Sequence, residues 1–287
     1  MVERRSFGNR VVVITGGGGG IGAALGRAFV AEGARVALLD RDTGALGEAV
    51  AALPKGRAMG IELDVCDEEA CEAVMDQVCS TWGGIDVLIN NAGISHRSLF
   101  ADTEASVVRR VMEVNFFGSV NCTAAALSSI TTRKGLIIAI SSVAGFAPLI
   151  GRTGYCASKH ALHGFYGSLR TELRGTGAEV MMVCPSFIAT KIETRALSGT
   201  GDAIGDGPRA KCVRRSSRRR SRRGRSPGPA TPSATAPGPK PGRSCSPTRS
   251  PRRSSPAQRA ATVCSRRRRS AEAPGGSHAS RRSSTKH

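Results

Sequence analysis

Tyr155 and Lys159 stand four residues apart in a segment with helical spacing. In a helix, this separation places the phenol and the ammonium group on one face. A phenol with its ordinary pKa of about 10 is a poor base at neutral pH, but a nearby cation stabilises the phenolate. The pair therefore predicts a proton-transferring group. The alternative is a solvated helix face, because the same spacing also arises by chance.

Ser142 lies thirteen residues before Tyr155, and together with Ser141 it directly follows an apolar run. The run, residues 136–140, predicts a buried strand. Ligands of open α/β sheets bind outside the carboxyl ends of the strands. A serine hydroxyl at this place is expected beside the ligand, which favours the catalytic interpretation of Tyr155 over the solvated face.

Five consecutive glycines, residues 16–20, follow the first predicted strand and open the first predicted helix. A backbone without Cβ atoms lets a phosphate approach closely, at the positive end of the helix. The run fits two spacings, which are G-x-G-x-x-G at Gly17, Gly19 and Gly22, and T-G-x-x-x-G-x-G at Thr15, Gly16, Gly20 and Gly22. A merely flexible turn is the alternative.

Asp40 ends the second predicted strand, 18 residues after Gly22. An acidic side chain at this distance accepts hydrogen bonds from the hydroxyls of an adenosine ribose. It would repel a 2′-phosphate, so NAD is favoured over NADP. Arg41 keeps NADP open, because a guanidinium could pair with that phosphate.

Short apolar runs alternate with helical segments along the first 184 residues. The runs are residues 11–15, 35–39, 58–63, 87–90, 136–140 and 179–184, and the helix candidates are residues 21–32, 44–53, 68–81, 103–130 (interpreted as two helices) and 155–174. This alternation predicts an α/β fold with a doubly wound parallel sheet, the Rossmann fold. Gly33 and Gly175 follow two helix candidates where a left-handed residue is favoured.

The sequence resembles the short-chain dehydrogenase/reductase family in landmarks that run in order over about 180 residues. They are residues 15–22, Asp40, Asp64 and Val65, residues 90–93, Asn115, Ser141 and Ser142, Tyr155 with Lys159, and residues 185–190.

The resemblance implies a role for each landmark. Tyr155 would be the general acid and base, and Ser142 would bind the substrate oxygen. Lys159 would bind the nicotinamide ribose and lower the pKa of the tyrosine, and Asn115 would hold a water that extends the proton relay. Asp64 and Val65 would meet the adenine, and Ile188 and Thr190 the carboxamide. The cofactor-binding residues are expected to be Thr15, Gly16, Gly20, Ile21, Gly22, Asp40, Asp64, Val65, Asn91, Ala92, Gly93, Tyr155, Lys159, Pro185, Ile188 and Thr190.

The expected reaction is the NAD(H)-dependent interconversion of a secondary alcohol, a small molecule, and its ketone. The alcohol loses a proton from oxygen as hydride leaves carbon, and the tyrosine can take that proton without a metal. The histidines 96, 160 and 163 are interpreted as helix and loop residues, and Trp82 as a packing residue at a helix end.

The net charge of +20 is confined to the last 87 residues. Residues 1–200 hold 19 basic and 19 acidic side chains, whereas residues 201–287 hold 23 and 3. The sequence therefore predicts a domain over residues 1–200 and a disordered Arg/Ser/Pro-rich tail over residues 201–287, which lacks the apolar side chains of a core. The tail is interpreted as a frameshift or splicing product, and the rival is a tail that binds polyanions without sequence preference.

The chain departs from the family in two places. Ser186 stands where a glycine is usual, which is expected to weaken cofactor binding somewhat. The helices and the seventh strand that usually follow have no counterpart after residue 200, so residues 179–184 are expected to form an exposed sheet edge. The alternative function is an inactive or impaired protein of this fold.

The remaining expectations concern compartment and assembly. There is no apolar run long enough to span a bilayer and no secretory leader, and the nine cysteines contain no C-x-x-C pair. We expect a cytoplasmic protein with reduced thiols and no membrane span. A homodimer or homotetramer is expected, with residues 103–130 and 155–174 pairing between subunits.

Overall fold

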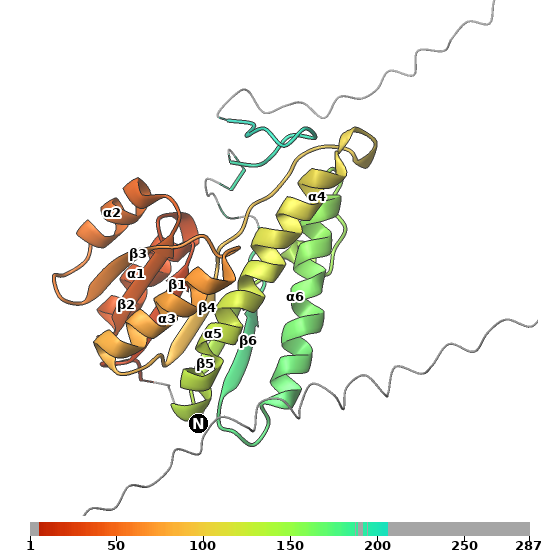
Figure 1. Cartoon of the computed structure of the whole chain (residues 1–287). Coiled ribbons are helices and arrows are strands. Elements are labelled where there is room, and N and C mark those ends of the chain that lie inside the picture. Colours follow the sequence, from red (N-terminus) through yellow and green to blue (C-terminus); the bar gives the residue numbers. More distant parts are fainter. Residues whose placement is uncertain (1–5, 187, 189–191, 194, 206–287) are drawn as a thin grey trace, which may run out of the picture. The chain divides into compact units, whose positions relative to one another are not determined.

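The computed structural model describes residues 6–186, 188, 192–193 and 195–205. Within these residues, parallel strands form one sheet in the order β3-β2-β1-β4-β5-β6 (Figure 1). The strands are β1 (Val11–Thr15), β2 (Arg35–Asp40), β3 (Ala58–Glu62), β4 (Val87–Asn90), β5 (Leu136–Ile140) and β6 (Glu179–Val183). The order reverses between β1 and β4, and ligands of such sheets bind at this switch point.

Helices cover both faces of the sheet. They are α1 (Gly20–Ala31), α2 (Thr43–Ala51), α3 (Glu68–Trp82), α4 (Ala105–Met112), α5 (Gly118–Thr132) and α6 (Thr153–Glu172), with short 3-10 turns η1 (Phe100–Asp102) and η3 (Val143–Gly145). Val11 and Val13 pack in one core with α3, α5 and α6, whereas Val12 and Ile14 pack in the other with α1 and α2. Alternate side chains of a strand point to opposite faces. The predicted doubly wound fold is confirmed.

The helical region predicted over residues 103–130 has no loop inside it. A π turn, η2 (Glu113–Phe117), joins α4 directly to α5, and Figure 1 shows the two as one long helix beside α6. A π turn inserts an extra residue into the helix and is frequent at functional sites. It contains the buried Asn115.

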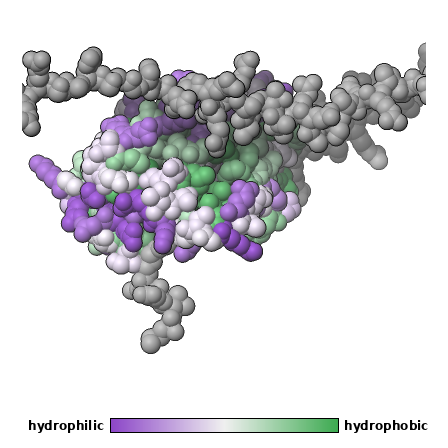
Figure 2. Space-filling view, turned by 60° about the horizontal axis from the view of Figure 1, so that its bottom comes forward, coloured by the Kyte–Doolittle hydropathy of each residue, from purple (hydrophilic) through white to green (hydrophobic). Residues whose placement is uncertain are grey.

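β6 is one of the two edge strands of the described sheet and pairs with β5. Met181 is 46% exposed and Val183 is 37% exposed. The expected exposed edge is therefore confirmed for the described residues. Figure 2 shows one face of the molecule, on which apolar residues lie at the surface among hydrophilic ones. Ordered contacts continue beyond residue 200, since Leu197 pairs with His96 and with Ala203. Residues 206–287, which include most of the predicted tail, lie outside the described residues.

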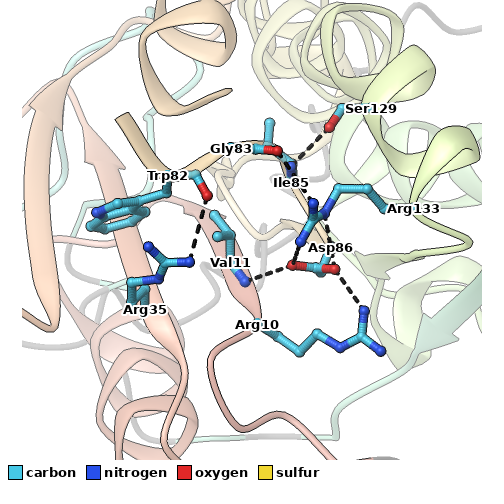
Figure 3. Close-up of polar contacts among 9 residues, drawn as sticks. All are labelled: Arg10, Val11, Arg35, Trp82, Gly83, Ile85, Asp86, Ser129 and Arg133. Carbon is cyan, nitrogen blue, oxygen red and sulfur yellow. Dashed lines mark hydrogen bonds and ion pairs between the residues drawn. The ribbon is translucent and has the colours of Figure 1, made fainter. Parts of the chain in front are cut away.

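A cluster of ion pairs lies at the end of the sheet where β1 and β4 begin, away from the carboxyl ends of the strands (Figure 3). Asp86 is 2% exposed and accepts hydrogen bonds from Arg10, from Arg133 and from the N–H of Val11 at 2.8–3.1 Å. Burial disfavours the carboxylate, but the hydrogen bonds outweigh burial and hold the pKa of Asp86 below its ordinary value. At the end of α3, the Arg35 guanidinium lies 5.8 Å from the ring centroid of Trp82.

Candidate active site

The glycine loop leaves the start of α1 open. Gly16 and Gly20 have positive φ angles of 64° and 54°, which favour glycine. A Cβ on Gly17 would lie 2.8 Å from the Leu38 side chain, so β2 packs directly on the loop. A Cβ on Gly19 would meet no atom within 4 Å, and α1 has no side-chain cap. Gly19 therefore leaves open space at a helix start that no side chain caps, where an anion can bind.

Asp40 is held against this loop. Its carboxylate accepts the N–H of Gly18 at 2.9 Å and the N–H of Asp42 at 3.0 Å. Beside it, a surface hollow of about 250 Å³ is lined by Arg41, Asp64, Cys66, Arg109, Arg110, Glu113 and Val114. The hollow is lined by Asp64, which the sequence predicts to contact the adenine, and by three arginines whose proximity the sequence did not predict. Burial, followed by the charge of Asp64, raises the pKa of Cys66 to about 12.

Thr15 and Asn91 clasp the two strands at the switch point. The Thr15 hydroxyl accepts the N–H groups of Asn91 and Ala92, both at 3.0 Å. The Asn91 amide donates to the carbonyls of Thr15 and Gly16 at 2.9 and 3.0 Å. These two predicted cofactor-binding residues thus fix the start of the glycine loop against the segment after β4.

Asn115 ties the loop after β4 to α6. Its Oδ1 accepts the N–H of Ile94 at 2.8 Å, and its Nδ2 donates to the Ile94 carbonyl at 3.0 Å and to the Ser158 hydroxyl at 2.9 Å. A Cβ on Gly93 would lie 3.2 Å from Asn115 Oδ1 and 3.7 Å from Lys159 Nζ. The loop therefore passes close to both predicted catalytic residues, and Gly93 leaves space between them.

Lys159 is buried beneath Tyr155. Its Nζ donates to the Ile140 carbonyl at the end of β5, at 2.8 Å, and lies 5.8 Å from the ring centroid of Tyr155. Burial lowers the pKa of Lys159 to about 8, because desolvation disfavours the ammonium form. The i, i+4 pair lies on the inward face of α6, so the solvated-face alternative is wrong for Lys159, which is 4% exposed.

Tyr155 lies against Ser142. Burial raises the pKa of the Tyr155 phenol, while a hydrogen bond with Ser142 and the charge of Arg152 act in the opposite direction. Burial outweighs these two effects, and the lowering of this pKa expected from Lys159 stays a prediction. The Ser142 hydroxyl also accepts the N–H of Ala144 at 3.2 Å, which fixes its position after β5.

The remaining predicted residues lie around this centre. The Pro185 carbonyl accepts the N–H of Val143 at 3.1 Å, beside Ser142. Val65 packs against Gly118 at the start of α5, and Asn121 donates to its carbonyl at 3.1 Å. Ile188 is 51% exposed, and Ser186 is exposed. Thr190 lies outside the described residues, and the effect expected of Ser186 stays a prediction.

The contacts of two polar residues were not predicted: the sequence assigns no role to Arg152, and it identifies His96 only as a helix or loop residue. Arg152 donates to the Ser95 hydroxyl and, at 2.8 Å, to the carboxylate of Glu193 from the segment after β6. His96 is fully buried and accepts the N–H of Gly154 at 2.9 Å. Neither contact has a local signal, because each joins segments far apart in the chain.

Taken together, a buried ammonium, a phenol and a serine hydroxyl meet at the carboxyl end of β5. The open helix start and Asp40 lie across the switch point. The sequence model described as short chain dehydrogenase matches residues 10–200. The chain belongs to the short-chain dehydrogenase family.

Individual members of the family agree with this fold. Dehydrogenase/reductase SDR family member 7B of Bos taurus is 39% identical over 206 residues, which are 69% of this chain and 63% of that protein. Meso-2,3-butanediol dehydrogenase of Serratia marcescens is 40% identical over 186 residues, which are 65% of this chain and 74% of that protein. The crystal structure of a short chain dehydrogenase/reductase from Burkholderia phymatum in complex with NAD has a TM-score of 0.63 and 29% identity, and the match covers 66% of this chain and 70% of that one. This chain thus spans less than two thirds of the length of the bovine relative.

Among the described residues, no helix is both long enough and apolar enough to cross a membrane.

Proposed function

We propose that this chain is an NAD(H)-dependent oxidoreductase that interconverts a secondary alcohol and a ketone. The observation that carries the proposal is that Ser142, Tyr155 and Lys159 lie together at the carboxyl end of β5, with the Lys159 Nζ 5.8 Å from the ring centroid of Tyr155. A hydroxyl, a phenol and a nearby buried cation are suited to move a proton to and from a substrate oxygen.

In the proposed reaction, the Tyr155 phenolate takes the hydroxyl proton of the alcohol, and Ser142 donates a hydrogen bond to the same oxygen. Because burial raises the pKa of the phenol, the phenolate needs nearby positive charge. Lys159, with Nζ 5.8 Å from the ring centroid, supplies it. Its own pKa of about 8 leaves it mainly protonated at neutral pH. Asn115 holds the loop after β4 against α6, and a water on this residue is the proposed end of the proton relay.

The residues present fit a dinucleotide. The glycine loop has open space at Gly19, and the Gly16 and Gly22 backbones approach so closely that a Cβ on Gly22 would collide with the Gly16 carbonyl. The α1 start would hold the pyrophosphate, Asp40 the adenosine ribose, and Asp64 and Val65 the adenine. When bound, NAD supplies the acceptor for the hydride. We propose NAD over NADP, because the Asp40 carboxylate faces the loop where a 2′-phosphate would lie.

The wider expectations remain proposals. We propose a domain over residues 1–200 that forms a homodimer or homotetramer through α4, α5 and α6, and a basic tail over residues 201–287. The six cysteines of the described residues are free, including Cys71 and Cys122 with sulfurs 3.6 Å apart in the core. This supports a reducing compartment such as the cytoplasm.

An impaired protein of this fold is the second candidate, and the apolar edge at β6 favours it. Met181 and Val183 are exposed side chains on this edge strand. In this case the basic tail, through non-specific contacts with polyanions, would carry the function.

NADH formation with a panel of secondary alcohols tests the proposal. The name of the Serratia relative makes meso-2,3-butanediol a first substrate to try, and each alcohol is paired with NAD and with NADP. Formation of the matching ketone supports the oxidoreductase. NAD binding without turnover of any alcohol would instead favour the impaired protein.

A further inference from the structure

His96 lies outside the proton-transferring group, yet it is fully buried beside it. It follows β4, between the loop held by Asn115 and the 3-10 turn η1. Its backbone pairs with Leu197 from the segment after β6. A buried polar side chain must have its hydrogen-bonding groups satisfied, so the partners of the imidazole define its state.

The hydrogen-bond partners of the His96 imidazole determine which ring nitrogen carries the proton. Thr103 Oγ1 donates to the Leu99 carbonyl at 2.7 Å, so it accepts from Ser98 Oγ at 2.7 Å. Ser98 Oγ has then used its proton and accepts from His96 Nδ1 at 3.3 Å. Nε2 accepts the backbone N–H of Gly154 at 2.9 Å and is therefore unprotonated. The imidazole is neutral with its proton on Nδ1.

The N–H that His96 accepts belongs to the first turn of α6. This helix begins after Arg152 without a side-chain cap, and its first N–H groups have no partner inside the helix. The imidazole satisfies one of them from a distant loop. A Cβ on Gly154 would lie 3.2 Å from Nε2 and 3.3 Å from the Val108 Cα of α4, so the glycine allows this close approach. The next residue is Tyr155.

We propose that His96 is a positioning residue for Tyr155: as a neutral imidazole, it accepts the Gly154 N–H and thereby fixes the start of α6 and the phenol that follows. The proposal rests on the proposed oxidoreductase function. His96 touches neither substrate nor cofactor in this account, and it acts through the backbone of α6.

Protonation would break the contact. A proton on Nε2 would turn the acceptor into a donor that faces another donor, and the new cation would lie at the positive end of a helix. Burial, followed by the charge of Arg152, lowers the pKa of His96. Arg152, the residue before α6, acts on the ring and is paired with Glu193. Arg97 on the loop, Asp102 in η1 and Glu104 before α4 are exposed to solvent, which screens their charges. Tyr155 is therefore held at neutral pH and released as the pH falls through the lowered pKa of His96.

The test compares two substitutions at His96 with one matched control. His96→Gln is uncharged but can accept the Gly154 N–H through its amide oxygen. His96→Phe fills the space and accepts nothing. His160→Gln is the control, because His160 is an exposed histidine of α6, the helix that His96 contacts. Values of kcat and KM for ketone reduction, in which Tyr155 reacts as the protonated phenol and is not inactivated by acid, are measured across pH 5–9, and the affinity for NADH is measured by fluorescence.

We expect His96→Phe to lower kcat roughly ten- to hundredfold, as a displaced acid–base group does, with KM and NADH affinity within about twofold of the wild type. His96→Gln should keep kcat within about threefold and lose the acidic limb that the wild type and His160→Gln share. An unchanged kcat in His96→Phe, or an acidic limb in His96→Gln at the wild-type pH, would overturn the proposal. An equal loss in both variants would do so too.

A second readout separates this proposal from the proposed function. The ¹⁵N shifts of the His96 imidazole should report a proton on Nδ1 and none on Nε2 at pH 7. Hydrogen exchange at the amides of residues 154 and 155 should accelerate at least tenfold in His96→Phe. If the wild type oxidises no alcohol, the proposed function fails, and the tautomer and the exchange rates decide the proposal for His96. An Nε2–H tautomer or unchanged exchange would refute it.

Discussion

Replacing Asp86 by alanine should destabilise the fold far from the active site. The substitution leaves the buried N–H of Val11 without an acceptor, which costs about 1–3 kcal/mol. It also removes the ion pairs to Arg10 and Arg133, whose side chains are 50% and 33% exposed. Solvent screening limits each of these pairs to about 0.5–1 kcal/mol. The free energy of unfolding should therefore fall by about 2–5 kcal/mol.

Thermal unfolding measures this loss, and a domain of this size should lose roughly 5–15 °C in Tm at pH 7. Asp76→Ala, on the exposed face of α3, is the matched control and should shift Tm by only a degree or two. The pKa of Asp86 is lower in the folded state than in the unfolded chain. Its contribution is thus complete above the ordinary pKa of an aspartate and is lost as the pH falls through the folded-state value. The Tm gap to the wild type should shrink in acid. A gap below 2 °C at pH 7, or one that widens on acidification, would refute the reasoning.

Three further predictions concern the site. Asp40→Ala should weaken NAD binding roughly tenfold and leave NADP binding unchanged or stronger, because a carboxylate that repels a 2′-phosphate is removed. Titration with both cofactors measures the two affinities, and equal losses for both would contradict the role of Asp40. Gly22→Ala should weaken binding of either cofactor more than tenfold with a modest loss of Tm, since its Cβ would push the Gly16 carbonyl out of the loop, and wild-type affinity would contradict the tight turn. Lys159→Met should abolish turnover yet raise the free energy of unfolding at pH 7 by about 1–2 kcal/mol. The reason is that the folded state lowers the pKa of this buried lysine to about 8, so its charge destabilises the fold below that pH. Chemical denaturation at pH 7 shows whether the free energy of unfolding rises or falls.

The sheet and the site landmarks could be predicted because their signals are local. The strands β1, β4 and β5 are continuous apolar runs that end in the polar residues Thr15, Asn90 and Ser141. The glycine run and the spacing of Tyr155 and Lys159 are equally visible in the sequence. Such signals also imply that these residues meet, since parallel strands end at one edge of the sheet.

The contacts that complete the site could not be predicted, because they join segments distant in the chain. α6 begins at Thr153, two residues before the predicted start, where Gly154 meets His96 across 58 positions. The π turn at Asn115 leaves no gap in the helical pattern, so its inserted residue is invisible in the sequence. The raised pKa of Tyr155 comes from burial, which spacing alone does not report.

The most direct test of the account compares the wild type with Tyr155→Phe in a single assay of alcohol oxidation, with NAD affinity measured in parallel. The substitution removes one hydroxyl and keeps the ring that packs above Lys159. We predict that the wild type forms NADH from at least one secondary alcohol and that Tyr155→Phe lowers kcat by on the order of a hundredfold or more, with NAD affinity unchanged. A Tyr155→Phe variant as active as the wild type would contradict the assignment of Tyr155 as the proton acceptor, and two proteins that bind NAD equally well and are equally inert would contradict the oxidoreductase.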